Sequence, residues 1–245
     1  MILSNVYNCR ALNLVLLALV IVAISLVGCQ PPADPAGGAA VKAGDDSASG
    51  KTGMSGMGKM KFPKSEDMKF KDEVDSNTKL PQNIADLTFV DKQGNPVKMS
   101  DYAGKQHVIL VFTEGFNGML CPFCKTQTSR LVANYEEFKR RNCEIIVVYP
   151  GPDDHLEEFV EAALNTEKVQ VDKVPFPIVL DSDFKATDFF DIHSMHAHPS
   201  TYLIDKDGGV QFAYVGTDMT ADRPSVKALL KKLDAIEQQE QQSKE

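Results

Sequence analysis

The sequence predicts an α/β fold in which a central mixed sheet carries helices on both faces. Residues 107–113 (HVILVFT) and 144–149 (EIIVVY) are nearly continuous apolar runs, which is typical of strands buried on both faces. Segments with helical periodicity alternate with these strands and with two later ones, so the order is β-α-β-α-β-β-α. This alternation favours helices packed on both sides of one sheet.

The first half of the predicted domain opens with a small hairpin, residues 87–90 and 97–99, around a Gly-Asn-Pro turn. The segment 122–142 is an expected amphipathic helix, because Leu131, Tyr135 and Phe138 recur at helical spacing. A further helix is expected through residue 165, capped at its start by Asp153.

The second half of the predicted domain contains shorter strands and helices. A strand is expected at 177–181 and a short helix at 185–191. A hairpin follows, with strands 201–205 and 210–215 joined by an Asp-Gly-Gly turn. The last helix covers 222–236, with Pro224 near its first turn, and a Gln-rich frayed tail is expected at 238–245.

Composition limits the function classes. With 43% apolar residues the chain can bury a core, and we expect one ordinary domain over residues 80–237. The net charge of -8 repels phosphate backbones, which excludes nucleic acid as an expected partner. No glycine-rich nucleotide loop is present, so no organic cofactor is expected.

The first 28 residues are typical of an export signal. Arg10 precedes an apolar run, residues 11–27, which is long enough that a short transmembrane helix is the alternative. The tetrapeptide at 26–29 (LVGC) resembles a bacterial lipobox, which implies that Cys29 becomes the lipid-carrying N-terminus of an extracytoplasmic, membrane-anchored protein. Residues 29–79 are rich in Gly, Ala, Pro, Ser, Asp and Lys and are expected to form a disordered tether.

The chemistry is concentrated in Cys121-Pro122-Phe123-Cys124, where the first buried strand gives way to a helix. Two thiols three residues apart can close a disulfide. The helix N-terminus offers free N–H groups and a positive dipole end to Cys121, so we expect an accessible Cys121 thiolate with a lowered pKa as nucleophile and Cys124 as resolving thiol. A structural zinc half-site and an inert disulfide are the alternatives.

Residues 108–131 (VILVFTEGFNGMLCPFCKTQTSRL) resemble the thioredoxin superfamily, and within it the alkyl hydroperoxide reductase/thiol-specific antioxidant, or peroxiredoxin-like, redoxins. Residues 198–205 (HPSTYLID) look like the loop that carries a cis-proline in thioredoxin folds, and the segments 214–216 and 222–224 continue the match. The resemblance covers about residues 80–233. It implies a thioredoxin-like three-layer fold, Cys121 as the attacking (peroxidatic) cysteine, and Pro199 as a cis-proline that shapes the substrate groove.

The sequence departs from the peroxiredoxin pattern at three positions. Glu114 and Gly118 stand where the family has its active-site Pro and Thr, and His198 stands in place of the usual Arg. These departures put fast peroxide reduction in doubt, whereas dithiol exchange needs none of the missing groups. The carboxylate of Glu114 could relay protons to the leaving thiol. The alternative interpretation is that Glu114 lies exposed in a loop and has no catalytic role. Cys143 is expected to be a buried hydrophobe.

Two clusters of soft ligands suggest copper as a further alternative. Met54, Met57 and Met60 lie in the tether, and His193 and His196 lie in a His/Met-rich loop before Pro199. Thioethers and imidazoles suit Cu(I), although tether methionines are often incidental and loop histidines are usually solvated.

We therefore expect an exported thiol oxidoreductase that an external thiol reductant recycles. Its substrate is either a protein disulfide or a peroxide, the latter reacting through a sulfenic acid. A copper metallochaperone and a non-catalytic redoxin-fold adaptor are the alternatives from other classes.

Overall fold

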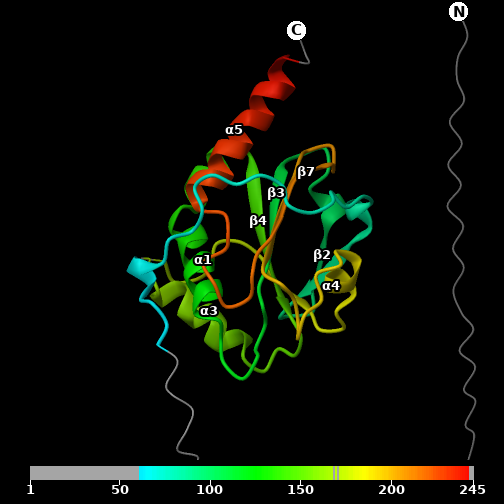
Figure 1. Cartoon of the computed structure of the whole chain (residues 1–245). Coiled ribbons are helices and arrows are strands. Elements are labelled where there is room, and N and C mark those ends of the chain that lie inside the picture. Colours follow the sequence, from blue (N-terminus) through cyan, green and yellow to red (C-terminus); the bar gives the residue numbers. More distant parts are fainter. Residues whose placement is uncertain (1–60, 168, 170, 243–245) are drawn as a thin grey trace, which may run out of the picture. The chain divides into compact units, whose positions relative to one another are not determined.

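The computed structural model describes residues 61–167, 169 and 171–242, and its seven strands form one mixed sheet in the order β2-β1-β5-β4-β3-β6-β7 (Figure 1). β3, β4 and β5 are parallel, and every other neighbouring pair is antiparallel. The strands are β1 (Thr88–Asp91), β2 (Pro96–Lys98), β3 (His107–Phe112), β4 (Cys143–Pro150), β5 (Ile178–Asp181), β6 (Ser200–Ile204) and β7 (Val210–Val215). The predicted strands and both hairpins are confirmed.

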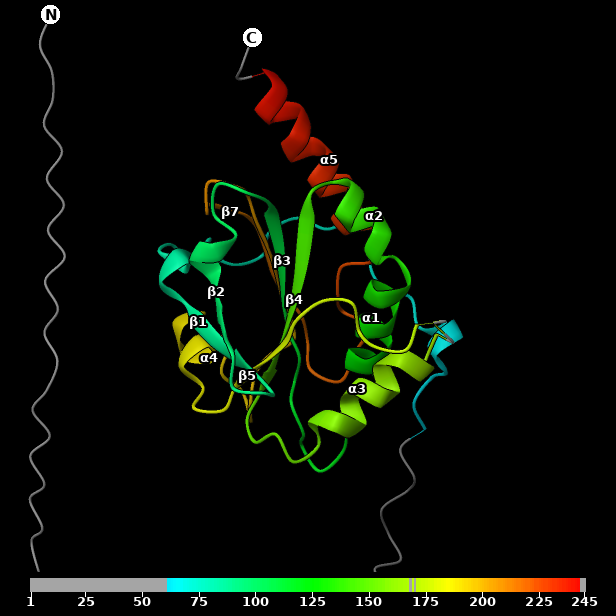
Figure 2. The ribbon, with the colours of Figure 1, turned by 180° about the vertical axis from the view of Figure 1, so that it is seen from behind.

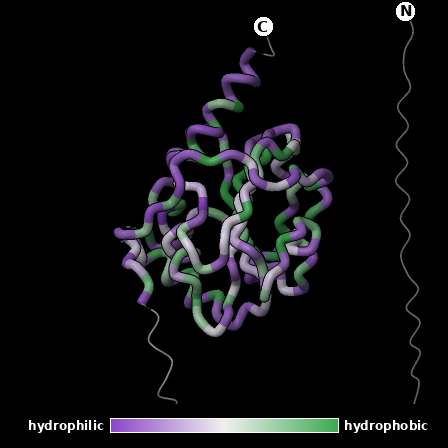
Figure 3. The backbone as a smooth tube through the Cα atoms, in the orientation of Figure 1, coloured by the Kyte–Doolittle hydropathy of each residue, from purple (hydrophilic) through white to green (hydrophobic). Residues whose placement is uncertain are grey.

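Helices cover both faces of this sheet, as predicted (Figures 1 and 2). The helices are α1 (Pro122–Ala133), α2 (Tyr135–Arg140), α3 (Leu156–Asn165), α4 (Lys185–Phe189) and α5 (Val226–Gln242). One core cluster joins the sheet to α1, α2, α3 and α5, and a second joins it to α4. Figure 3 shows the hydrophobic residues gathered along the central strands, with a hydrophilic outer end on α5. Among the helices of the described residues, none has the length and apolarity needed to cross a bilayer.

Several predicted helix boundaries are wrong. The last helix, expected from residue 222, begins at Val226, so Pro224 lies before it and not in its first turn. The short helix expected over 185–191 ends at Phe189.

The expected single helix over 122–142 is divided at Asn134, whose φ of -116° and ψ of 15° are not helical. The Asn134 side-chain amide donates to the Arg130 carbonyl oxygen at 2.8 Å, and such local side-chain bonds compete with the helical ladder. α3 begins at Leu156, and Asp153 contributes its backbone carbonyl rather than a capping side chain.

The expected frayed tail is also wrong for residues 238–242, which continue α5. Glu240 holds this last turn to the sheet, because one of its carboxylate oxygens lies 2.9 Å from Lys206 Nζ and the other lies 3.5 Å from His107 Nε2. His107 begins β3 and is fully buried. Residues 243–245 lie outside the described residues.

The largest correction concerns residues 61–79, here called the N-terminal strap, which the composition assigns to the tether. The strap, cyan in Figure 1, runs beside α1 and then past α5. Met68 and Phe70 are buried in the core. The Arg130 guanidinium donates to the backbone carbonyls of Ser65 and Met68 at 2.6 and 3.0 Å. These few apolar anchors and hydrogen bonds offset the ordering entropy of a polar segment.

Polar contacts hold the second half of the strap. Lys71 pairs through its backbone with the residues on either side of Pro224, with N···O distances of 2.8 Å in both directions. Beyond it, acidic strap residues form ion pairs with the lysines of α5: Asp72 with Lys227, Glu73 with Lys231 and Asp75 with Lys232. The strap therefore belongs to the folded domain, and it reaches the segment that carries Arg223.

Candidate active site

The dithiol lies where α1 begins, at the end of the sheet at which the parallel strands β3 and β4 terminate. Cys121 is the N-cap of α1, and its sulfur accepts the backbone N–H of Cys124 at 3.4 Å. Pro122 occupies the first turn, where a missing N–H costs no helical hydrogen bond. Both cysteines are free thiols. The predicted placement at a helix N-terminus is confirmed.

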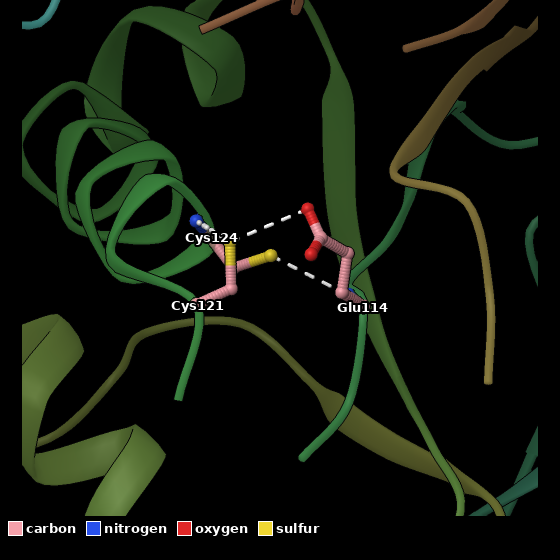
Figure 4. A group of neighbouring side chains, drawn as sticks. All are labelled: Glu114, Cys121 and Cys124. Carbon is pink, nitrogen blue, oxygen red and sulfur yellow. Dashed lines mark hydrogen bonds between the residues drawn. The ribbon is translucent and has the colours of Figure 1, made fainter. Parts of the chain in front are cut away.

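Glu114 follows β3 by two residues and joins both sulfurs (Figure 4). The Cys121 thiol donates to Glu114 Oε1 at 3.3 Å, and the Glu114 backbone N–H donates to Cys124 Sγ at 3.4 Å. Glu114 is only 1% exposed, so the interpretation as a solvated loop glutamate is wrong. The next residue, Gly115, leaves no room for a side chain, because a Cβ there would lie 2.5 Å from the Pro150 carbonyl oxygen.

Arg223 completes the site from the connection between β7 and α5. Its Nη2 lies 2.6 Å from Glu114 Oε1 and 3.6 Å from Cys121 Sγ, and it is 1% exposed. Its Nη1 donates to Gln127 Oε1 at 3.4 Å. A buried guanidinium with these partners supplies the positive charge that a buried carboxylate and a thiolate need.

The segment before Arg223 also closes over the carboxylate. The backbone N–H of Met219 donates to Glu114 Oε1 at 2.9 Å, and Met219 adopts a left-handed backbone conformation with φ of 52°. Glu114 Oε1 is thus approached by a guanidinium, an amide and a thiol. The carboxylate is held in one orientation beside Cys121.

The electrostatics contradict the expected lowered pKa of Cys121. The hydrogen bond with Cys124 and burial raise the pKa of the Cys121 thiol. For Cys124, burial acts against the thiolate, but the side-chain interaction with Cys121 and the charge of Arg223 outweigh it and lower the pKa. Two adjacent buried thiols cannot both ionise easily, and here the negative charge is favoured on Cys124. The charges of Cys124, Cys121 and Glu114 also raise the pKa of Arg223, against the effect of its burial.

The expected accessibility of Cys121 is wrong for this reduced arrangement. Cys121 and Cys124 are each 2% exposed and belong to the core cluster on the α1 face. The side chain of Phe123, between them, packs edge-on against Phe62 of the strap, with ring centroids 6.4 Å apart. The sequence shows that the thiols stand at a helix end, but not that they are buried there or that a strap residue packs against Phe123.

The expected cis-proline is also wrong. Peptide bonds among the described residues are all trans, including the bond between His198 and Pro199. Pro199 directly precedes β6, and its carbonyl oxygen accepts the backbone N–H of Gly216 at 2.8 Å. A trans bond keeps the chain extended into this strand pairing. The link from β6 to the site runs instead through Thr201, whose Oγ1 lies 3.5 Å from Gln127 Nε2.

The histidine-rich loop does not join the thiols. His193 Nδ1 bonds to Asp188 at 2.6 Å, and His198 Nδ1 bonds to Asp218 at 2.7 Å. His196 stacks on Phe184 and lies against Gly115. Within the part of the chain that the structure describes, the His, Cys, Asp and Glu side chains close enough to share a metal ion are Glu114, Cys121 and Cys124. Met54, Met57, Met60 and Cys29 lie outside the described residues.

Cys143 is a buried hydrophobe, as predicted. It is fully buried at the start of β4, and burial raises the pKa of its thiol.

Arg223 and Gln127 are the site residues that sequence reasoning missed. The segment 222–224 continues the redoxin resemblance, which marked its position but not its contact with Glu114, 109 residues away. Gln127 lies one helical turn after Cys124 on the same helix face, a spacing that could have indicated it.

A protein-family model, that of the AhpC/TSA family, matches residues 80–213 of this chain. The thiol-disulfide oxidoreductase ResA of Bacillus subtilis is 32% identical over 127 residues, which is 52% of this chain and 62% of that protein. Peroxiredoxin Bcp of Bacillus subtilis is 27% identical over 138 residues, 53% of this chain and 80% of that protein. The crystal structure of peroxidoxin BcpB from Mycobacterium tuberculosis superposes with a TM-score of 0.53 at 20% identity, covering 65% of this chain and 99% of that one.

Proposed function

The chain belongs to the AhpC/TSA family and is a thiol-based oxidoreductase of the redoxin type, and we propose that its principal reaction is thiol–disulfide exchange through Cys121 and Cys124. Redoxin relatives work with thiol reductants and with disulfide or peroxide substrates. The observation that carries the proposal is the contact of both sulfurs with Glu114 at the start of α1.

The geometry supports a two-step exchange. Glu114 Oε1 accepts the proton of Cys121 as its sulfur attacks one sulfur of a substrate disulfide. The substrate S–S bond breaks, the leaving sulfur takes the electron pair, and a mixed disulfide forms on Cys121. The Cys124 thiolate then attacks Cys121 Sγ, which closes the Cys121–Cys124 disulfide and releases the second substrate sulfur. Glu114 returns its proton to a departing sulfur, so the substrate leaves reduced.

Peroxide reduction by the same thiols is the second candidate, and Arg223 is the observation that favours it. Glu114, Gly118 and His198 replace the residues that a peroxiredoxin uses to hold its thiolate and peroxide. Arg223 nevertheless brings a guanidinium to 3.6 Å from Cys121 Sγ. It could polarise a peroxide oxygen, but it already pairs with Glu114 at 2.6 Å, so its donors are partly occupied.

Competition between the two substrates tests the proposal. The reduced protein is mixed rapidly with hydrogen peroxide or with a peptide mixed disulfide at equal concentration near neutral pH, and loss of the two thiols is followed. We expect the disulfide to react at least about tenfold faster, since the site lacks a free set of peroxide-polarising donors. A faster reaction with peroxide would reverse the order of the two candidates.

We also propose that the protein is exported and anchored to a membrane by lipid on Cys29. The support is the apolar run 11–27, whose last two residues begin the Leu-Val-Gly-Cys tetrapeptide at residues 26–29. In a bacterium fed an alkyne-tagged fatty acid, the full-length protein should carry the label and Cys29→Ser should not. Cys9→Ser, within the signal, is the matched control and should keep the label. Equal labelling of the Cys29→Ser variant would refute the proposed anchor.

A further inference from the structure

The connection between β7 and α5 supplies two of the groups that surround Glu114 and Cys121. The backbone N–H of Met219 donates to Glu114 Oε1 at 2.9 Å, and Arg223 Nη2 lies 2.6 Å from the same oxygen. Arg223 Nη2 also lies 3.6 Å from Cys121 Sγ. The position of this connection therefore decides whether a cation lies beside the dithiol.

One residue of the strap, Lys71, is bonded to this connection through both its backbone and its side chain. Its N–H donates to the Arg223 carbonyl oxygen, and its own carbonyl oxygen accepts the N–H of Ser225, each at 2.8 Å. Its Nζ lies 2.5 Å from Asp222 Oδ1 and donates to the Tyr214 hydroxyl at 2.7 Å. The strap is thus tied to the residues on either side of Arg223.

These side-chain bonds meet at Asp222, the residue directly before Arg223. The Tyr214 hydroxyl donates to Asp222 Oδ1 at 2.6 Å, and the N–H and hydroxyl of Thr217 donate to Oδ2 at 3.2 and 3.0 Å. Burial opposes ionisation of Asp222, but the Lys71 ammonium and the Tyr214 and Thr217 donors outweigh it and lower the pKa of Asp222 to about 2. Asp222 is therefore an anion at neutral pH, and Lys71 is its cationic partner.

An unneutralised carboxylate at Asp222 would compete with Glu114 for the guanidinium of Arg223, because it belongs to the adjacent residue and attraction grows at short range. The Lys71 ammonium removes this competition by occupying Asp222 Oδ1. The charged groups that contact the two sulfurs are Glu114 and Arg223, and a nearby cation favours a thiolate over a thiol.

We propose that Lys71 is a positioning residue of the dithiol site: it binds Asp222 and so keeps the Arg223 guanidinium on Glu114 and Cys121. This inference rests on the proposed function, because it concerns the same pair of thiols. The strap is then a working part of the active site, although its composition is that of a tether.

The match to the AhpC/TSA family model does not assign this role. That match covers residues 80–213, and Lys71, Asp222 and Arg223 all lie outside it.

Lys71→Met tests the proposal, because it removes the ammonium group and keeps the backbone bonds of residue 71. Lys71→Arg retains the charge and is the conservative variant. Lys231→Met is the matched control, since it breaks another ion pair between the strap and α5, that of Lys231 with Glu73. The readouts are the first ionisation of the reduced dithiol, followed by thiolate absorbance against pH, and the equilibrium with dithiothreitol above that ionisation.

For Lys71→Met we expect the first ionisation constant of the dithiol to fall about threefold, because the cation is held less firmly beside the sulfurs. The effect is small because the Lys71 side chain is half exposed. The equilibrium with dithiothreitol should shift by about the same threefold factor toward the disulfide, since only the reduced form carries the thiolate. Lys71→Arg and Lys231→Met should both keep the wild-type values.

A double-mutant cycle separates positioning from a general structural role. In an Arg223→Met background, Lys71→Met should cause no further change in the ionisation constant, because the group that it positions is absent. The same decrease in both backgrounds would overturn the inference. So would wild-type values in Lys71→Met, or an equal decrease in Lys231→Met, and these two comparisons do not depend on the stability of Arg223→Met.

The ionisation readout requires no turnover, so it separates this inference from the proposed function. If the wild-type protein neither forms nor opens a Cys121–Cys124 disulfide, the exchange reaction fails. The titration of the reduced thiols in Lys71→Met still decides the role of Lys71 in that case.

Discussion

Replacing Arg223 by methionine is expected to lower the free energy of unfolding of the reduced protein by about 3–5 kcal/mol. The substitution leaves the Glu114 carboxylate buried without the guanidinium that lies 2.6 Å away. It also removes the donor to Gln127 and the cation next to Cys121. Urea unfolding of the reduced protein, followed by far-ultraviolet circular dichroism, measures the loss.

Two controls isolate the cause. Lys231→Met removes the partner of Glu73 from an exposed pair, and it should leave the free energy of unfolding almost unchanged because solvent screens such a pair. The double variant, Glu114→Gln with Arg223→Met, removes both charges. It should recover a large part of the lost free energy of unfolding, because no uncompensated carboxylate remains. If the double variant is as unstable as the sum of the two single variants, the ion pair is not the source of the effect.

Replacing Cys121 by serine is expected to reduce the exchange rate by a factor of about a thousand or more, because an alcohol is not an effective nucleophile toward a disulfide near neutral pH. The fold should tolerate the change. Serine is among the preferred N-cap residues, so its hydroxyl can accept the Cys124 backbone N–H that Cys121 Sγ accepts now. Turnover of a mixed-disulfide peptide and thermal unfolding measure the two effects separately.

The other cysteines provide the matched comparison. Cys124→Ser should accumulate the mixed disulfide on Cys121, since no resolving thiol remains, and mass spectrometry detects it as an added peptide mass. Cys143→Ser should keep the exchange rate, because that thiol is fully buried at the start of β4, away from the pair. Full turnover by Cys121→Ser would refute the assignment of Cys121 as the nucleophile.

Burial of the reactive sulfurs has a consequence for substrate entry. A folded protein substrate cannot reach a sulfur that is 2% exposed without local movement of the residues that enclose it. The strap touches this enclosure at Phe123 and beside Arg223.

The hydrophobic pattern of the sequence was sufficient to predict the central strands of the sheet. The apolar runs became β3 and β4 within one residue of the expected bounds, since a strand buried on both faces has no other stable place in an α/β protein. The strap could not be predicted in this way. Its composition is that of a tether, and its two buried apolar residues, Met68 and Phe70, join a core cluster that also contains residues of α1 and α5.

By itself the sequence determined the chemistry that is present: two thiols one helical turn apart, placed at the junction of a buried strand and a helix. Strand and helix propensities are local, and so is the geometry of a short turn. Only the tertiary structure decided how those thiols are charged, since Glu114 and Arg223 come from separate parts of the chain. The interaction of buried charges depends on distance in space and on exclusion of water, and neither is written in the spacing of residues along the chain.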